Sequence, residues 1–348
     1  MPGKESDNFT DIEQRKGAHI RLCLDPRSQA GQSIFAKYRL PYTALPEASL
    51  ADVDTACTFL GKQLAFPLLV ASMTGGSEHG RAINTNLAIA AQHCGVALGL
   101  GSQRIGLEKQ DAKDTFELVR KHAPDAVIMA NMGAVQLNYG HDVESYRRIV
   151  DMVQANGLYL HLNPLQEALQ PGGDIDFRGL LPKIQKLVDQ VGVPVIVKEV
   201  GHGISAAVAR QLFEVGVHGI DTAGVGGTSY AWVEAERSHN NAFAEWFKSF
   251  GLPTDTSVQQ AVSAKTKESQ LVIASGGVRS PLDGLKARAW GADLFSAAVP
   301  FLAPAMRSSD EVIAVIENWK RGLAVAMFAS GAASWETARQ LSLTKESD

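Results

Sequence analysis

Short apolar segments that recur along most of the chain constrain its fold more than any other feature. From residue 67 onward, eight such runs rich in β-branched residues lie mostly about 30 residues apart, at residues 67–72, 96–100, 126–130, 158–161, 194–198, 219–222, 271–274 and 292–297. Each run is short and nearly continuous in apolarity, which is typical of parallel strands buried on both faces. Because helical patterns separate the runs, the sequence predicts an α/β fold, a (β/α)8 TIM barrel.

Three of the intervening helices carry recognisable boundary residues. Asp142 and Ser205 can each cap a helix by accepting a hydrogen bond from a backbone N–H group, and Pro281 suits the first turn of a helix. Glycines favour helix ends, so we expect these helices to end at Gly157, Gly216 and Gly291. Residues 308–341 are expected to form helices on the outside of the barrel.

A doubly wound open sheet is the main alternative to the barrel. Such a sheet would more naturally carry a Gly-x-Gly-x-x-Gly turn after its first strand, whereas the first run leads into Met73-Thr74-Gly75-Gly76. The exceptional spacing lies between residues 222 and 271, where a polar insertion contains Trp232 and Trp246. We place this insertion above the catalytic rim. We predict one domain overall, with residues 1–66 as an N-terminal arm and capping segment and residues 67–348 as the barrel.

The composition excludes several classes of function. The chain has 348 residues and a formal net charge of −4, which gives no general attraction to nucleic acid or to a membrane surface. Cys23, Cys57 and Cys94 form no CxxC pair, which indicates a reducing compartment and no zinc site. No apolar run approaches the roughly 18–20 residues of a membrane span, and the first eight residues lack a signal-peptide core. We therefore expect a cytoplasmic protein.

The residues that follow the predicted strands carry most of the chemistry. In a barrel of this type they converge on one face, and nearly every strand end here has a hydroxyl, an amide, a cation or a glycine. Gly276-Gly277 and Ala297-Ala298 follow the last two strands, where such barrels usually bind phosphate, and a glycine-rich turn at residues 224–229 follows the strand before them. A lone glycine pair would indicate only a tight turn, but adjacent placement favours a bound phosphate.

Lys198 ends an apolar run, so its side chain is expected to lie along the barrel interior. A buried lysine needs an anionic partner or a shifted pKa. It could act as a Schiff-base nucleophile, stabilise an anionic reduced cofactor ring, or form a salt bridge in the core, and the sequence does not separate these alternatives.

The segment from Leu158 to Glu167 changes abruptly from apolar to polar. Pro164 forbids a simple continuation of the strand, so His161, Asn163, Gln166 and Glu167 would cluster where the strand meets a loop. A carboxylate there could bind Mg²⁺, which in turn usually binds phosphate oxygens. The plain alternative is a loop with a capping asparagine and a solvated Gln-Glu pair. Near the N-terminus, Arg15, Lys16 and His19 form either a solvated cluster or an arm that closes over an anion.

These motifs together resemble the type 2 isopentenyl-diphosphate isomerases, an FMN-dependent family. The similarity runs from about residue 11 to about residue 302 and follows the family's order. It rests on Arg15-Lys16 with His19, Met73 to Gly76, Gly101 to Arg104, His161 to Glu167, Lys198 to Gly201, Gly226 to Thr228 and Ser275 to Arg279. The His-x-Asn-x-x-Gln-Glu element is the most specific, because other FMN barrels lack it.

The resemblance implies a role for each matching residue. FMN would be bound by Ala71, Ser72, Met73, Thr74, Ser102, Asn131, Lys198, Thr228, Gly276, Gly277, Val278, Arg279, Ala297 and Ala298. The substrate diphosphate would be bound by Arg15, Lys16, His19, Arg104, His161 and Asn163, and Glu167 would ligate Mg²⁺. Gln166 would lie at the reacting alkene, Lys198 would favour the anionic reduced flavin, and Glu234 would be a second proton-handling or positioning group. NADPH would serve only to reduce FMN, and the chain would form a homo-oligomer, a tetramer or octamer.

Three other functions compete with this interpretation. An FMN-dependent oxidoreductase needs a catalytic histidine or a cysteine loop, and none of the cysteines lies at a late strand end. A Schiff-base lyase acting through Lys198 would leave Gln166 and Glu167 without a use. A non-catalytic flavin- or phosphate-binding scaffold would not need polar groups on most strand ends.

Overall fold

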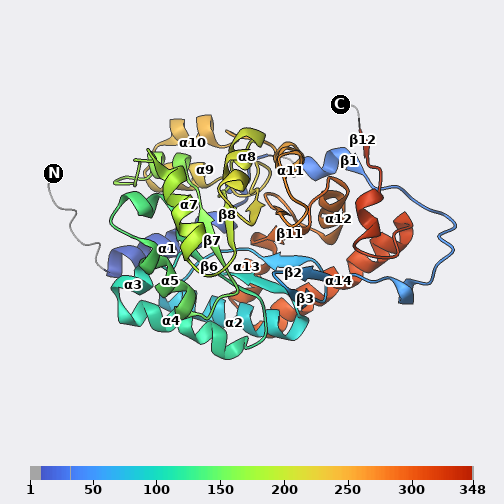
Figure 1. The fold of residues 1–348 in the computed structure, drawn as a ribbon, viewed down its shortest axis with the longest axis horizontal. Coiled ribbons are helices and arrows are strands. Elements are labelled where there is room, and N and C mark those ends of the chain that lie inside the picture. The colour runs from blue at the N-terminus through green and yellow to red at the C-terminus, as the bar shows by residue number, and fades with distance from the viewer. Residues whose placement is uncertain (1–8, 32, 347–348) are drawn as a thin grey trace.

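The computed structural model describes residues 9–31 and 33–346 and places them around one closed barrel (Figure 1). Its strands are all parallel and follow the order of the chain from β4 to β11. They are β4 (Leu68–Val70), β5 (Ala97–Gly99), β6 (Ile128–Gly133), β7 (Gly157–His161), β8 (Val195–Lys198), β9 (Gly219–Asp221), β10 (Leu271–Ala274) and β11 (Leu294–Ala297). β11 pairs with β4 and closes the sheet, which confirms the (β/α)8 barrel and excludes the open sheet.

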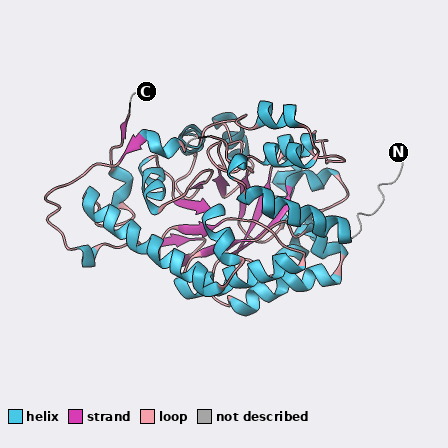
Figure 2. Cartoon of the chain, turned by 180° about the vertical axis from the view of Figure 1, so that it is seen from behind, coloured by secondary structure: helices cyan, strands magenta, loops and turns pink. Residues whose placement is uncertain are grey.

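Helices surround the strands on the outside of the barrel (Figure 2). The longer ones are α2 (Glu78–Cys94), α4 (Gln110–His122), α5 (Val143–Met152), α7 (Leu180–Gln190), α8 (Ala206–Glu214), α11 (Thr254–Ser263), α12 (Pro281–Ala289) and α14 (Ser309–Ser330). Shorter helices, α3 (Arg104–Glu108), α6 (Pro164–Leu169), α9 (Tyr230–Arg237), α10 (Asn241–Phe247) and α13 (Val299–Ala305), complete the set. Within the described ranges, no helix has the length and apolarity needed to cross a bilayer.

The predicted helix starts are confirmed, but one predicted end is wrong. Asp142 forms a capping box with Ser145 at the start of α5, and Ser205 accepts a hydrogen bond from the N–H of Val208 in α8. Pro281 is the first residue of α12. α5 ends at Met152, so Gly157 does not terminate it but opens β7. A methyl group on Gly157 would come within 2.7 Å of Met129 Cε, so Met129 packs directly against this glycine.

Two strand and insertion boundaries also differ from the expectation. β6 starts two residues after the predicted run and continues to Gly133, so Asn131 lies inside the strand rather than after it. Within the insertion, α9 and α10 are additions above the barrel, whereas α11 packs against α8 and β10 as an ordinary outer helix. Trp232 on α9 is buried and Trp246 on α10 is exposed.

An N-terminal hairpin contributes to the barrel core. β2 (Cys57–Phe59) and β3 (Lys62–Leu64) pair antiparallel, and Phe59 and Leu64 belong to the same buried cluster as Met129 and Tyr159 from the barrel interior. This cluster fills the barrel with close-packed side chains, as expected when all strands point their alternate residues inward.

A short strand of the N-terminal region pairs with a strand near the C-terminus. β1 (Tyr38–Arg39) pairs antiparallel with β12 (Thr344–Lys345). α1 (Phe9–Leu24), a helix that the weak periodicity of residues 1–66 did not predict, contacts α9 and α13. The division of the chain into residues 1–66 and 67–348 stays a prediction.

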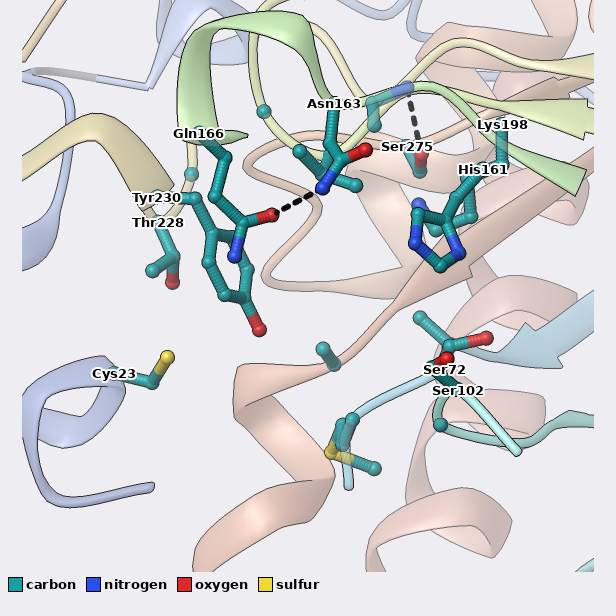
Figure 3. A pocket seen from close by; sticks show the side chains of 18 of the residues that line it. Cys23, Ser72, Ser102, His161, Asn163, Gln166, Lys198, Thr228, Tyr230 and Ser275 are labelled. Atoms are coloured by element: carbon teal, nitrogen blue, oxygen red, sulfur yellow. Dashed lines mark hydrogen bonds between the residues drawn. The ribbon is translucent and has the colours of Figure 1, made fainter. Parts of the chain in front are cut away.

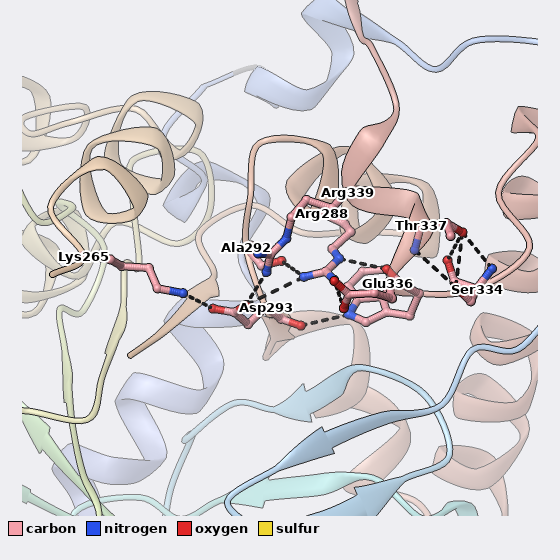
Figure 4. Close-up of polar contacts among 9 residues, drawn as sticks. Lys265, Arg288, Ala292, Asp293, Ser334, Glu336, Thr337 and Arg339 are labelled. Carbon is pink, nitrogen blue, oxygen red and sulfur yellow. Dashed lines mark hydrogen bonds and ion pairs between the residues drawn. The ribbon is translucent and has the colours of Figure 1, made fainter. Parts of the chain in front are cut away.

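Polar contacts fasten the C-terminal segment to the barrel (Figure 4). Arg288 on α12 is 2% exposed, donates hydrogen bonds to the carbonyl oxygens of Trp335 and Ala292, and lies 5.2 Å from the Trp335 ring. Asp293 lies between three cations, Lys265, Arg288 and Arg339, so that each charge has a partner. The cluster fixes the turn that leads into β11.

Candidate active site

A cavity of about 320 Å³ opens at the carboxyl ends of the strands and receives residues from all of them (Figure 3). Of the predicted site residues, these line it: His19, Ala71, Ser72, Met73, Thr74, Ser102, Arg104, Asn131, His161, Asn163, Gln166, Glu167, Lys198, Thr228, Gly276, Gly277, Val278, Arg279, Ala297 and Ala298. Parallel strands bring these residues together because their carboxyl ends share one face. Their location is thereby established, and their individual roles stay predictions.

One predicted residue, Glu234, does not line the cavity, and the structure describes no side chain for two others. The backbone of Arg15 and Lys16 belongs to α1, but their side chains lie outside the described part of the chain. His19, one turn further along α1, does reach the cavity. Glu234 is fully buried just behind the wall and touches His19 and Gln166, which both line it.

The glycine-rich loops that follow β9 and β10 pack directly against each other. Gly276 and Gly277 have φ angles of +100° and +79°, which L side chains rarely adopt. A methyl group on Gly276 would come within 2.6 Å of the Gly224 nitrogen, and one on Gly277 within 2.5 Å of the Gly226 carbonyl carbon. Only glycine permits this packing. Both loops line the cavity, and glycine-rich turns of this kind suit an anion.

A segment of the N-terminal region forms the outer wall of these glycine loops. Gln29 bridges to Thr228, and the N–H of Ala30 donates to the Gly227 carbonyl oxygen at 2.8 Å. The guanidinium of Arg279 donates to the side-chain oxygen of Gln29. Burial lowers the pKa of Arg279, but a guanidinium stays protonated at neutral pH. The cavity therefore has one fixed cation beside the glycine loops.

Several buried oxygens in the cavity have no hydrogen-bond partner among the described residues. These atoms are the hydroxyl oxygens of Ser72, Thr74 and Ser296 and the side-chain oxygen of Asn163. Because buried polar groups are almost always paired, these atoms indicate a polar ligand. The hydroxyls of Ser72 and Thr74 follow β4 and that of Ser296 lies on β11, all at the mouth of the barrel, so the residues present fit FMN, with its polar ring edge, ribityl hydroxyls and phosphate.

Lys198 at the end of β8 lies beside a buried carboxylate that sequence reasoning missed. Its Nζ lies 3.7 Å from Oδ1 of Asp221 and donates to the Glu199 carbonyl oxygen at 3.0 Å. Asp221 is fully buried and also accepts hydrogen bonds from the hydroxyls of Tyr159 (2.8 Å) and Ser275. Burial and the Asp221 charge raise the pKa of Tyr159 well above its ordinary value, so Tyr159 stays a neutral donor. An aspartate that ends an apolar run, as Asp221 does, was the available sequence signal.

His161 is held as a neutral imidazole. Asn131 donates to the Leu100 carbonyl oxygen at 2.8 Å, which turns its side-chain oxygen towards Nδ1 of His161, also at 2.8 Å. Nδ1 therefore carries the proton and Nε2 has a free lone pair. Burial, followed by the positive charges of Lys198 and Arg104, lowers the pKa of His161 to about 4. The ring is thus an acceptor until an anion or another donor changes its protonation.

Gln166 and Glu167 lie on a helix and not in a loop. Pro164 begins α6, and Asn163 at its N-cap position makes no capping bond, so the plain alternative of a loop with a capping asparagine is wrong. Asn163 instead donates to Glu167 Oε1 at 2.8 Å and to Gln166 Oε1 at 3.2 Å. The backbone N–H of Asp174 donates to Glu167 Oε2 at 2.7 Å. The Glu167 carboxylate is therefore held in place at the cavity wall.

A second carboxylate, Asp174, positions the Arg104 cation beside α6. Its side chain lies 3.4 Å from Arg104 and accepts from Gln136 at 2.9 Å. Asp174 and Gln136 both line the cavity, but no motif in the sequence marks them. Arg104 is thus aimed into the cavity on the same side as Glu167.

Glu234 on α9 gathers three donors around one buried carboxylate. His19 Nε2 lies 3.0 Å and Gln166 Nε2 3.1 Å from Oε1, while Arg237 contacts Oε2 at 2.8 Å. Burial raises the pKa of Glu234, but the hydrogen bonds from His19 and Gln166 and the charge of Arg237 outweigh it and lower the pKa to about 2. Glu234 is therefore ionised at neutral pH, and it fixes the Gln166 amide with its oxygen towards Asn163.

The described residues contain no group of three His, Cys, Asp or Glu side chains that could hold a metal ion by themselves. Mg²⁺ commonly binds one or two protein carboxylates and completes its shell with water and substrate phosphate oxygens. Glu167 fits the role of such a single carboxylate ligand.

Comparisons with known proteins agree with the barrel fold and also indicate the family of the chain. A family model described as FMN-dependent dehydrogenase matches residues 175–345. An isopentenyl-diphosphate delta-isomerase of Nostoc sp. (strain PCC 7120) is 44% identical over 96% of this chain and 95% of its own length. A protein of the same name from Synechocystis sp. (strain PCC 6803) is 46% identical over 94% of this chain and 95% of its own.

Solved structures show the same fold at low identity. A mandelate oxidase bound to (S)-2-phenylpropionate aligns with a TM-score of 0.66 and 19% identity, over 98% of this chain and 99% of its own. At this identity the likeness concerns the fold alone.

Proposed function

Because this chain belongs to the isopentenyl-diphosphate delta-isomerase family, we propose that it interconverts isopentenyl and dimethylallyl diphosphate in a cavity that holds FMN and Mg²⁺. The chain is thus an isomerase enzyme. The observation that carries the proposal is that one cavity joins the glycine loops of β9 and β10 to the cluster formed by Asn163, Gln166 and Glu167. One half suits a flavin phosphate and the other a metal-bound diphosphate.

The chain's own residues would bind FMN through a phosphate end and a ring end. At the phosphate end, Gly276, Gly277 and Val278 offer backbone N–H groups and Arg279 offers a cation. At the ring end, the unpartnered hydroxyls of Ser72 and Thr74 would find their missing hydrogen bonds. The remaining proposed contacts are Ala71, Met73, Ser102, Asn131, Lys198, Thr228, Ala297 and Ala298. Reduced FMN, when bound, supplies the proton-transfer chemistry that ordinary side chains perform poorly on an alkene.

Lys198 would keep a positive charge beside the flavin ring. Its Nζ lies 3.7 Å from the buried carboxylate of Asp221, which gives the lysine an anionic partner. A Schiff-base nucleophile must be unprotonated, so this pairing favours the electrostatic role over the lyase alternative.

The opposite side of the cavity would hold the diphosphate. Arg104 is aimed there by Asp174, and Asn163 and His161 line the same wall. His19 reaches the site from α1, and Arg15 and Lys16 are proposed to act from the same helix. Glu167, which lines this part of the cavity, would bind Mg²⁺. Binding the diphosphate so firmly would orient the short isoprenyl tail towards the flavin.

Gln166 and Glu234 would handle or position the proton at the alkene. Gln166 lines the cavity and its amide is fixed at both ends, by Asn163 and by Glu234. Since Glu234 is ionised, it can accept a proton but not donate one at neutral pH. We also propose NADPH as the reductant of FMN and a homo-oligomeric assembly, both by analogy with the family.

A two-step experiment tests the function. We expect purified protein to show the absorption bands of a bound flavin and, after reduction by NADPH with Mg²⁺ present, to convert isopentenyl diphosphate into dimethylallyl diphosphate. A preparation without flavin that still isomerises the substrate would refute the cofactor assignment. A flavoprotein that oxidises a hydroxy acid but leaves isopentenyl diphosphate unchanged would refute the reaction.

A further inference from the structure

Gln29 joins the two glycine loops of the cavity from outside. Its side-chain oxygen accepts a hydrogen bond from the Arg279 guanidinium, which belongs to the loop after β10. Its side-chain nitrogen donates to Thr228 Oγ1 at 3.4 Å, in the loop after β9, and to Ser28 Oγ at 2.9 Å. The amide of Gln29 is therefore used at both ends, and each end holds a different loop.

The backbone around Gln29 holds the loop after β9 as an added strand would. Ala30 donates to the Gly227 carbonyl oxygen at 2.8 Å, and Ser229 donates to the Ser28 carbonyl oxygen at 2.8 Å. Gln29 and Thr228 form an antiparallel bridge between these two bonds. The position of the Gln29 side chain is thus set by main-chain contacts and does not depend on the ligand.

Arg279 needs such a partner because of where it lies. Its backbone N–H donates to Asp283 at 2.9 Å, and its guanidinium donates to the neighbouring Val278 carbonyl oxygen at 3.4 Å and to the side-chain oxygen of Gln29. A long cationic side chain without a fixed partner adopts many rotamers, and fixing it upon binding costs affinity. The neutral oxygen of Gln29 orients the guanidinium but leaves its charge available to an anion.

We propose that Gln29 is a positioning residue of the cofactor site, which aims Arg279 and Thr228 at the phosphate group of FMN. The inference rests on the proposed FMN binding and deepens it. Gln29 contacts neither the residues proposed to bind the flavin ring nor the cluster of Asn163, Gln166 and Glu167. Its effect on binding is therefore confined to the phosphate of FMN. It also explains why a chain segment far from the barrel strands in sequence takes part in cofactor binding.

The test uses two flavins that differ only in the phosphate. FMN and riboflavin are titrated into flavin-free protein, and quenching of flavin fluorescence gives each dissociation constant. For Gln29→Leu we expect the dissociation constant of FMN to rise about tenfold, because a charged hydrogen-bond donor loses its orientation. The dissociation constant of riboflavin should stay within about twofold of the unsubstituted protein, since riboflavin lacks the group that Arg279 would meet.

Gln260→Leu is the matched control. Gln260 is another half-buried glutamine that links two elements, since its side-chain oxygen accepts from the N–H of Ala206, but it lies outside the cavity. It should leave both constants unchanged. Equal weakening of FMN and riboflavin by Gln29→Leu would show a merely structural role and overturn the proposal, as would unchanged FMN affinity.

If Gln29→Leu does not fold, the unsubstituted protein and Arg279→Met still decide the matter. The proposal requires that FMN bind more tightly than riboflavin and that Arg279→Met abolish most of this difference. Equal affinity of the unsubstituted protein for both flavins would overturn the inference while leaving flavin binding intact. Failure to bind either flavin would refute the proposed function itself.

Discussion

Replacing Glu234 by glutamine should remove one of the strongest buried interactions of the molecule. Glu234 is fully buried; its oxygens accept hydrogen bonds from Gln166 at 3.1 Å and Arg237 at 2.9 Å, and His19 Nε2 lies 3.0 Å away. A glutamine would turn an NH₂ group towards at least one of these donors. The change keeps the volume of the side chain, so it tests charge and hydrogen bonding rather than packing.

The pKa shift of Glu234 sets the expected magnitude. The pKa falls from 4.5 to about 2 on folding, and each pKa unit corresponds to about 1.4 kcal/mol. The ionised carboxylate therefore stabilises the folded state by about 3 kcal/mol at neutral pH. Because the folded-state pKa is the lower one, this contribution is complete above about pH 4.5 and is lost as the pH falls through about 2.

Urea unfolding of flavin-free protein, followed by circular dichroism, measures the effect. We expect Glu234→Gln to lower the free energy of unfolding by about 3 kcal/mol at pH 7, and the difference from the unsubstituted protein to shrink as the pH falls below about 4.5. Glu236→Gln on the same helix is the control. Glu236 is 28% exposed and lies 3.8 Å from Arg27, so its loss should cost less than about 1 kcal/mol. Equal effects of the two substitutions, or a Glu234 effect that does not change with pH, would refute the reasoning.

Three further outcomes are expected. Gly276→Ala should raise the dissociation constant of FMN by about tenfold or more in the fluorescence titration, because the new methyl group would displace the loop after β9. Gly291→Ala is the control: Gly291 has a nearly equal φ angle of +101° but lies outside the cavity, so the dissociation constant should not change. Glu167→Gln should weaken the Mg²⁺ dependence of turnover, and an unaltered Mg²⁺ titration would remove Glu167 from the metal site. Arg288→Met should lower the free energy of unfolding by about 2 kcal/mol, since it removes buried hydrogen bonds while Asp293 keeps two other cations, and FMN affinity should not change.

The family resemblance implies roles for Glu234, Gln166 and Glu167 in one reaction. In the structure, hydrogen bonds, some of them through Asn163, connect these three side chains. Asn163 links Gln166 to Glu167, and Gln166 links this pair to Glu234. The residues proposed to handle the proton and the proposed metal ligand therefore belong to one hydrogen-bonded unit. A substitution at Asn163 should affect both.

The sequence by itself determined the barrel and the location of most site residues. Buried parallel strands can be recognised from the sequence alone, because each strand is apolar on both faces and therefore forms a short continuous apolar run. Once the strands are known, the convergence of their carboxyl ends follows from the topology, and this brings Lys198, His161 and Gly276 to one face.

Only the tertiary structure decided which charges meet and which segments complete the walls. Asp221 looks in sequence like any aspartate after a strand, and its pairing with Lys198 depends on the register between β8 and β9. Gln29 and Asp174 lie in irregular segments, where no periodicity tells which loop they will touch. A repeating apolar pattern depends only on residues within one helix or strand, so it can be recognised in the sequence. A hydrogen bond between distant segments depends on how the whole chain folds, so it cannot.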